Sequence, residues 1–304
     1  MLYISQTALE LGFLYALVAM ALFLSYRILD IADMSTDGCF VLGAAVSVTM
    51  AASGHPILGI FAAMIAGSLS GFVTAFLQTR MGLPSILAGI VTNMGLYTIN
   101  LMVMGWSANV SLLKTPTIFS IFSDLGIGSA WSDALLAGFV TILAGVLLVL
   151  FLKTRIGLSI RATGDNMDMV RASSINPTFT ITIGLCISNS LTALSGAMVG
   201  QYQNTADING GTGIVVIGLA CLIIGETVLG KRTIIKGAIA AILGSIIYRL
   251  IYAIVLYTKF MPVQALKLAT AIIVALAIAA PTIKNWIAFH KRKMAARARR
   301  KGGN

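Results

Sequence analysis

Nine apolar runs dominate the sequence, and they meet or approach the length of about 20 residues that an α-helix needs to cross a bilayer. They lie at 8–26, 38–52, 57–78, 85–104, 134–152, 178–199, 213–229, 237–256 and 264–284. With 58% hydrophobic and 10% charged residues, the chain is too apolar for a soluble globular protein. The sequence therefore predicts an all-α, polytopic transmembrane helical bundle of about nine spans, with residues 1–304 as a single domain. The second and seventh runs are short and glycine-rich, which predicts broken or re-entrant helices packed inside protein.

The distribution of positive charge predicts the orientation of the chain. Of the 21 Lys and Arg residues, 17 fall on one alternating set of loops and on the tail, and three fall on the other set. Because basic loops stay on the cytoplasmic side, we expect the 153–177 loop and the C-terminus to be cytosolic and the N-terminus external. The basic tail at 285–304 is typical of an anchor on anionic lipid, so membrane lipid and no nucleic acid is the expected partner.

The sequence offers little for catalysis. It has two histidines, far apart, and no P-loop, zinc-protease or serine-hydrolase motif. Its three cysteines lie in apolar runs without CxxC spacing, and we interpret them as small buried hydrophobic residues. The chain is therefore not expected to be an enzyme or to hold a metal or cofactor. If it takes part in ATP-driven transport, the ATPase must be another chain.

The 153–177 loop is the one long polar segment with apolar runs on both sides. Gly164 is expected to break the chain, and Asp165 or Asn166 to cap a new helix of about two turns by accepting from its free N–H groups. Asn176 and Pro177 are expected to end this helix and begin the next span.

This short helix is expected to present a flexible apolar surface beneath the membrane. Met167 and Val170 lie three residues apart on one face, with Met169 beside them, and Arg171 follows. The alternative is a solvated connector that lies on the lipid headgroups.

The pattern Thr154-x-x-Gly157-x-x-Ile160-Arg161-Ala162-x-Gly164-x-Asn166 resembles the cytosolic coupling segment of the branched-chain amino acid and ribose class of ABC importer permeases. In that family the loop seats a short helix in a cleft of the ATPase subunit. The resemblance implies ATPase contacts from Arg155, Gly157, Arg161, Gly164, Asp165, Asn166, Met167, Met169, Val170 and Arg171. The segment departs from the family pattern at Ser173-Ser174-Ile175-Asn176, where a Leu-Gly-Ile type of ending is expected.

A second resemblance lies in the turn at 27–38. Its Asp33-Met34-Ser35-Thr36-Asp37-Gly38 is similar to the Asp-Leu-Thr-Val-Asp-Gly turn of a permease subgroup that includes importers of tryptophan and other aromatic amino acids. Asp37 is expected to cap the second span, and Asp30 and Asp33 to pair with Arg27. The alternative is a turn that enters the membrane partway and helps to gate a pore.

Polar residues inside two apolar runs are candidates for a translocation path. Asn93 and Asn100 lie seven residues apart on one helix face, with Tyr97 between them, and Ser188 and Asn189 lie near mid-depth of another run. Such side chains face either another helix or water, so they serve as interhelical contacts or as the lining of the path.

The glycine-rich loop at 200–213 resembles the family's external loop before a broken helix. Gln203, Asp207 and Asn209 are its candidate contacts to a binding protein or a gate, and a merely flexible loop is the alternative. Glu226 and Arg249 lie deep in apolar runs, where each needs a partner or water, and a direct pair between them is not expected. Arg249 either holds helices together or meets a substrate carboxylate on the translocation path.

The resemblance implies a permease subunit of an ABC importer in the bacterial cytoplasmic membrane. It implies a homodimer with the pore between two permease copies, two cytosolic subunits that bind ATP and Mg, and an extracytoplasmic substrate-binding protein. The implied solute is a small amino acid, with aromatic ones favoured. The alternatives are a sugar or nucleoside permease, or an ion-coupled secondary transporter, although the sequence has no convincing carboxylate or histidine at mid-depth for ion coupling.

Overall fold

The computed structural model describes residues 2–112, 115–124, 131–230 and 233–257, together with residues 271, 272, 275 and 279. Residues Met1–Ala253 form one compact unit and Ile254–Asn304 form a second. Most of the ninth predicted span at 264–284, and the whole predicted lipid anchor at 285–304, lie outside the described residues.

Helices account for most of the described chain. They are α1 (Leu2–Leu22), η1 (Phe23–Ile28), α2 (Thr36–Ala52), α3 (Pro56–Thr79), α4 (Ser85–Val103), α5 (Ile118–Asp124), α6 (Ser132–Lys153), α7 (Arg155–Asp165), α8 (Met167–Ala172), α9 (Pro177–Gln203), α10 (Ile214–Leu229) and α11 (Ile234–Tyr257). Among the described residues, six helices are long and apolar enough to cross a membrane, and α2 and α10 are apolar but shorter. The predicted polytopic helical bundle is confirmed, and so is the shortness of the second and seventh runs.

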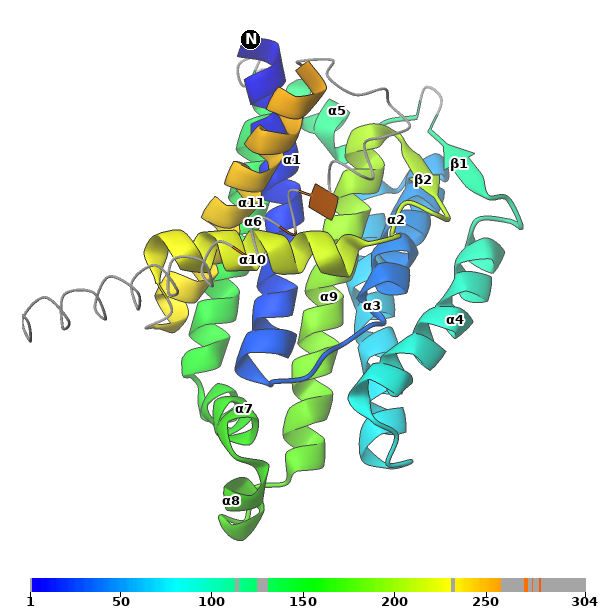
Figure 1. Ribbon diagram of the computed structural model, residues 1–304. Coiled ribbons are helices and arrows are strands. Elements are labelled where there is room, and N and C mark those ends of the chain that lie inside the picture. The colour runs from blue at the N-terminus through cyan, green and yellow to red at the C-terminus, as the bar shows by residue number, and fades with distance from the viewer. Residues whose placement is uncertain are drawn as a thin grey trace, which may run out of the picture. The chain divides into compact units, whose positions relative to one another are not determined.

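The core of the first unit is built around α1 and α9. The most apolar 18-residue windows of these helices are 78% and 72% buried, whereas the corresponding window of α4 is 28% buried. Figure 1 shows α9 between α1 on one side and α2 and α3 on the other, with α10 running across them. Burial inside protein explains why α9 tolerates more polar residues than the outer helices.

Small residues let α2 and α9 cross at close range. A Cβ atom on Gly196 would overlap the carbonyl oxygen of Phe40, and one on Gly43 would overlap that of Ala193. Cys39 and Leu42 fill the space beside this contact in a buried apolar cluster. Close backbone approach of this kind is the usual basis of helix association inside a membrane.

Two short strands, β1 (Asn109–Ser111) and β2 (Thr205–Asp207), pair antiparallel with Asn109 opposite Asp207. The Thr205 hydroxyl donates to Asn109 Oδ1 at 2.9 Å. This pair lies at the end of the bundle opposite α8 (Figure 1). Strands of three residues carry too little alternation to be recognised in the sequence, and the prediction missed them.

The turn between η1 and α2 differs from the prediction. Arg27 pairs with Glu226, with 3.1 Å between Nε and Oε1, and Asp33 accepts hydrogen bonds from Ser35 N and Asn189 Nδ2, each at 2.8 Å. The expected pairing of Asp30 and Asp33 with Arg27 is therefore wrong. The pairing fails because Asp30 has a left-handed backbone. Its φ of 54° turns the chain, so Asp30 and Asp33 do not share a helix face with Arg27.

Candidate functional site

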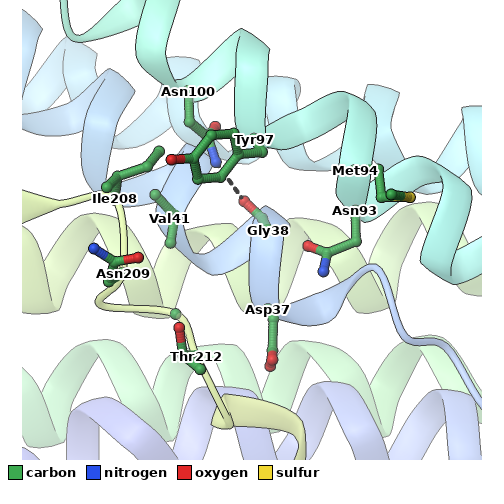
Figure 2. A pocket seen from close by; sticks show the side chains of 11 residues that line it. Asp37, Gly38, Val41, Asn93, Met94, Tyr97, Asn100, Ile208, Asn209 and Thr212 are labelled. Atoms are coloured by element: carbon green, nitrogen blue, oxygen red, sulfur yellow. Dashed lines mark hydrogen bonds between the residues drawn. The ribbon is translucent and has the colours of Figure 1, made fainter. Parts of the chain in front are cut away.

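A cavity of about 460 Å³ lies between α2, α4 and the loop that leads into α10, and Figure 2 shows it from close by. Its volume falls within the range of small-molecule sites. It is lined by Asp37, Gly38, Val41, Asn93, Met94, Tyr97, Asn100, Ile208, Asn209, Gly211 and Thr212. The wall combines amides, a phenol, a thioether and a single carboxylate, and it suits a small solute that carries both polar and apolar groups.

The predicted polar stripe on α4 forms one side of this cavity. Asn93, Tyr97 and Asn100 line it together, while Asn209 approaches from the opposite loop (Figure 2). Asn100 is buried, and its Nδ2 donates to the carbonyl oxygen of Gly38 at 3.0 Å. Asn100 thus ties α4 to α2, whereas Tyr97 lines the cavity and is 51% exposed.

Asp37 caps a different helix from the one expected. Its two carboxylate oxygens accept from the backbone N–H groups of Gly213 and Val215, at 3.0 and 2.9 Å. The residue at the start of α2 is Ser35, which makes no side-chain cap bond. The prediction that Asp37 caps its own span is wrong, because its side chain reaches across to the free N–H groups of α10.

The predicted contacts in the glycine-rich loop at 200–213 divide between two cavities. Gln203 and Asp207 line a second cavity of about 320 Å³, together with the aromatic rings of Tyr15 and Phe40. Asn209 lines the first cavity instead.

Ser188 and Asn189 line neither of these two cavities. The Ser188 hydroxyl donates to the carbonyl oxygen of Ala21 at 2.9 Å, and Asn189 Nδ2 donates to Asp33 Oδ2 at 2.8 Å. Both residues are buried and connect α9 to the chain around η1. In this structure they act as interhelical contacts, which was one of the two roles considered for them.

Arg249 packs against aromatic rings. Its guanidinium carbon lies 3.7 Å from the ring centroid of Tyr15 and 5.7 Å from that of Tyr252. Within the described residues its Nε has no hydrogen-bond partner. The cation–π contact joins α11 to α1, which supports the role of Arg249 in holding helices together.

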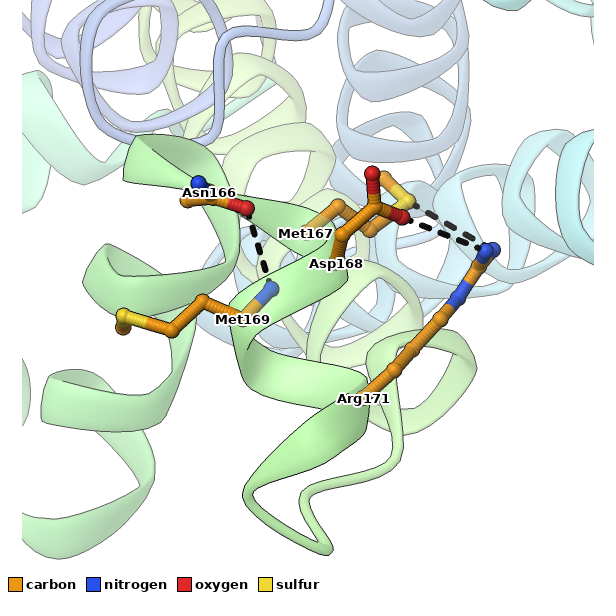
Figure 3. Close-up of polar contacts among 5 residues, drawn as sticks. All are labelled: Asn166, Met167, Asp168, Met169 and Arg171. Carbon is orange, nitrogen blue, oxygen red and sulfur yellow. Dashed lines mark hydrogen bonds and ion pairs between the residues drawn. The ribbon is translucent and has the colours of Figure 1, made fainter.

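The polar segment after α6 forms two helices, α7 and α8, and the boundary between them lies at Asn166. Asn166 Oδ1 accepts from Met169 N at 3.0 Å, so of the two candidate caps Asn166 caps α8, whereas Asp165 is the last residue of α7 (Figure 3). Gly164 does not break the chain. It belongs to α7, where a Cβ atom would overlap the carbonyl oxygen of Ile28.

The exposed surface of α8 is narrower than expected. Met169 is 54% exposed and Met167 is 37% exposed, whereas Val170 is fully buried. The expected outward position of Val170 is wrong, because the chain after α8 folds back and Ile175 N donates to the Val170 carbonyl oxygen at 3.2 Å. Arg171 lies 3.7 Å from both the Asp168 carboxylate and the Met167 sulfur (Figure 3).

The remaining residues of the predicted contact set are not equally accessible. Arg155, Asp165 and Asn166 are exposed, and Arg161 is half-buried. Gly157 is buried at the corner between α6 and α7, where a Cβ atom would overlap the carbonyl oxygen of Phe151. Gly157 therefore allows the tight corner between α6 and α7, and its buried position keeps it out of the surface that a partner could contact.

The sequence model of the family described as "Branched-chain amino acid transport system / permease component" matches residues 5–281, which is most of the chain. The chain belongs to this family. This permease is 35% identical over 260 residues to a tyrosine transport system permease protein of Clostridioides difficile, with 85% of each chain covered. It is 33% identical to an uncharacterised protein of Rickettsia prowazekii over 90% of its own length and 95% of that protein's.

A more distant relative carries a different solute in its name. The permease is 26% identical over 265 residues to a fructose import permease protein of Bifidobacterium longum, covering 86% of the chain and 73% of the relative. No solved structure gives a significant match.

Several cavity residues of the permease were missed from the sequence. Met94 and Thr212 line the first cavity, and Ile208 and Gly211 belong to the loop that closes it. Met94 lies one residue after Asn93, and the apolar pattern of this run predicts that it faces lipid. For Ile208, Gly211 and Thr212, the signal in the sequence was the glycine-rich loop that contains them. Glycine has no side chain, so the backbone of such a loop can approach a solute closely.

Replacing Ser174 with glycine is expected to stabilise the permease by about 1 kcal/mol, because Ser174 holds a left-handed backbone with φ of 60°. Thermal unfolding in detergent measures the change. Ser173→Gly is the control, since Ser173 has a φ of −89° and its hydroxyl bonds the Met169 carbonyl. If Ser174→Gly melts at the wild-type temperature or below it, a left-handed backbone at Ser174 is contradicted.

Proposed function

We propose that this permease is the membrane subunit of an ATP-driven importer of an aromatic amino acid. The observation that carries the proposal is the cavity beside α4, in which Tyr97, Met94 and three asparagine side chains surround a space of solute size. Its aromatic and apolar groups suit a ring, and its amides and carboxylate suit an ammonium and a carboxylate group. The name of the Clostridioides difficile relative supports tyrosine as the first solute to test.

In this proposal the energy comes from a separate cytosolic ATPase that binds ATP and Mg. The docking surface is the exposed side of α7 and α8, where Met167 and Met169 present adaptable apolar side chains beside Arg155 and Arg171. Closure of the ATPase on ATP displaces this surface and opens the path to the cytosol.

The assembly has two permease copies, with the open side of the cavity facing the second copy. Large apolar side chains along the outer face of α4, among them Ile90, Met94 and Met102, are exposed in the single chain and suit such a contact. The N-terminus and the β1–β2 end face outward, where a substrate-binding protein delivers the solute, and the C-terminus is cytosolic. The host membrane is the bacterial cytoplasmic membrane.

Uptake into proteoliposomes tests this function. The permease is reconstituted with its ATPase and binding protein, and labelled tyrosine is added with ATP and without an ion gradient. We expect uptake that depends on ATP and is competed by phenylalanine or tryptophan. Competition by fructose alone would favour a sugar permease, as the relative from Bifidobacterium longum suggests, and uptake that needs an ion gradient but no ATP would make the chain a secondary carrier.

Replacing Tyr97 with alanine is expected to lower uptake roughly fivefold, because an aromatic contact of about 1 kcal/mol to the solute is lost. ATP hydrolysis by the assembly should stay unchanged. Ile99→Ala is the matched control, since Ile99 is an exposed residue of α4 that does not line the cavity. Equal uptake by the two variants would remove Tyr97 from the path.

A further inference from the structure

A short connector contacts the short helix α10 at both of its ends. Residues 27–37, here called the strap, run from the end of η1 into the first turn of α2, and Figure 1 shows this connector crossing in front of α9. At one end of the strap, Arg27 pairs with Glu226 near the C-terminal end of α10, at 3.1 Å. At the other end, the Asp37 carboxylate accepts hydrogen bonds from the backbone N–H groups of Gly213 and Val215, where α10 begins. The strap therefore fixes both the start and the end of this helix.

Hydrogen bonds brace residues 33–36 of the strap. Asp33 Oδ1 accepts from the backbone N and the hydroxyl of Ser35, at 2.8 and 2.6 Å, and the Thr36 hydroxyl donates to the Asp33 carbonyl at 3.0 Å. The other carboxylate oxygen of Asp33 accepts from Asn189 on α9. These bonds hold residues 33–36 in one turn and tie that turn to α9, which limits local bending there.

The strap also lies directly against the predicted docking segment. Gly164 of α7 sits so close to Ile28 that there is no room for a Cβ atom. The next strap residue, Leu29, packs its side chain onto Gly184 of α9 in the same way. Movement of α7 therefore pushes on the strap without any intervening side chain.

The far end of the strap forms part of the cavity wall. Asp37 and Gly38 line the cavity, and so do Gly211 and Thr212 in the loop that leads into α10. A Cβ atom on Gly211 would overlap the carbonyl oxygen of Asp37, so the two chain segments are in close contact there. A shift of the strap and α10 changes the shape of this wall.

We propose that Asp37 and the Arg27–Glu226 ion pair are positioning residues that make α10 follow the strap when α7 is displaced, so that force applied at the docking segment reshapes the solute cavity. The proposal rests on the proposed function, because it takes the displacing force from a separate ATPase. It goes beyond that function in naming the chain segment that carries the displacement and the contacts that hold α10 to it.

The first test compares two substitutions of the same chemistry on the strap. Asp37→Asn keeps one acceptor oxygen and places an amide group against the other N–H of α10, whereas Asp30→Asn changes an exposed residue with φ of 54°, which asparagine adopts readily. In proteoliposomes, Asp37→Asn should transport at least about tenfold less tyrosine per ATP hydrolysed, and Asp30→Asn should match wild type. If Asp37→Asn transports as much tyrosine per ATP hydrolysed as wild type does, the proposal is overturned.

The second test exchanges the charges at the other end of α10. Arg27→Glu and Glu226→Arg should each lower the amount of solute moved per ATP, and the double variant should regain at least about a third of it. Rescue of coupling separates a positioning role from a general loss of stability, which melting temperatures measure in parallel. A double variant as uncoupled as the single ones overturns the proposal, and this test decides the matter if Asp37→Asn does not assemble.

A third readout does not depend on which solute is moved. Thr212→Cys, in a Cys186→Ser background, places a thiol in the cavity wall beside α10, and its rate of maleimide labelling is measured in the assembled transporter with and without ATP and vanadate. The rate should change with ATP when the strap is intact and stay constant in Asp37→Asn. If tyrosine is not transported but this response appears, the proposed solute is wrong and the strap proposal stands. A labelling rate that ATP does not alter overturns the strap proposal.

Discussion

Alanine in place of Gly196 is expected to destabilise the permease by about 3 kcal/mol or more and to remove most folded protein from the membrane. The added methyl group has no space, because it would overlap the carbonyl oxygen of Phe40 where α2 and α9 cross. Both helices are held there by further contacts, among them Gly43 against Ala193, so neither can move away. Yield of monodisperse protein and thermal unfolding in detergent measure the effect.

Gly95→Ala is the matched control for this prediction. Gly95 lies in α4 with no atom within 4 Å of an added Cβ, so alanine there costs no overlap and favours the helix by up to about 1 kcal/mol. Equal stability of the Gly196 and Gly95 variants would show that α2 and α9 do not cross as described.

Aspartate in place of Met169 is expected to lower ATP-driven uptake by at least about tenfold while the permease folds and inserts normally. Met169 is 54% exposed on α8, so the charge costs little until a partner covers it. A carboxylate buried unpaired against an apolar surface costs several kcal/mol, which is enough to prevent docking of the ATPase. Uptake and ATPase activity of the reconstituted assembly measure the loss.

Met81→Asp is the control for the docking surface. Met81 is 62% exposed in the turn between α3 and α4, outside the α7–α8 segment, and it carries the same substitution at a similar exposure. It should leave uptake unchanged. Normal uptake in Met169→Asp, or an equal loss in both variants, would contradict docking through α8.

The helices and the polar stripe on α4 could be predicted because each depends on local periodicity. Apolar runs of helical length fix the spans, and the spacing of Asn93, Tyr97 and Asn100 places them on one face whatever surrounds it. The same holds for Asn166, whose side chain caps the helix that follows it. Local rules therefore sufficed for these parts.

The partners of charged residues could not be predicted, because they come from distant parts of the chain. Asp37 binds the start of α10 and Arg27 binds Glu226, and in both cases the partner lies more than 170 positions away along the chain. Sequence spacing favoured neighbours such as Asp30 and Asp33 for Arg27, but one left-handed residue removed them from its face. Gly164 was misread for a related reason, since its role is close contact with Ile28 and not a break in the helix.

Cross-linking from α8 tests most directly the claim that a separate ATPase drives this permease. A cysteine introduced at Met169 is exposed on α8, whereas two of the three natural cysteines, Cys39 and Cys221, are buried. In the assembled transporter, a short reagent that is thiol-reactive at one end and photoreactive at the other should join this cysteine to the ATPase subunit, with a yield that changes when ATP and vanadate are added. Labelling of the same cysteine by a lipid-phase reagent, without a cross-link to any ATPase in either condition, would contradict the account.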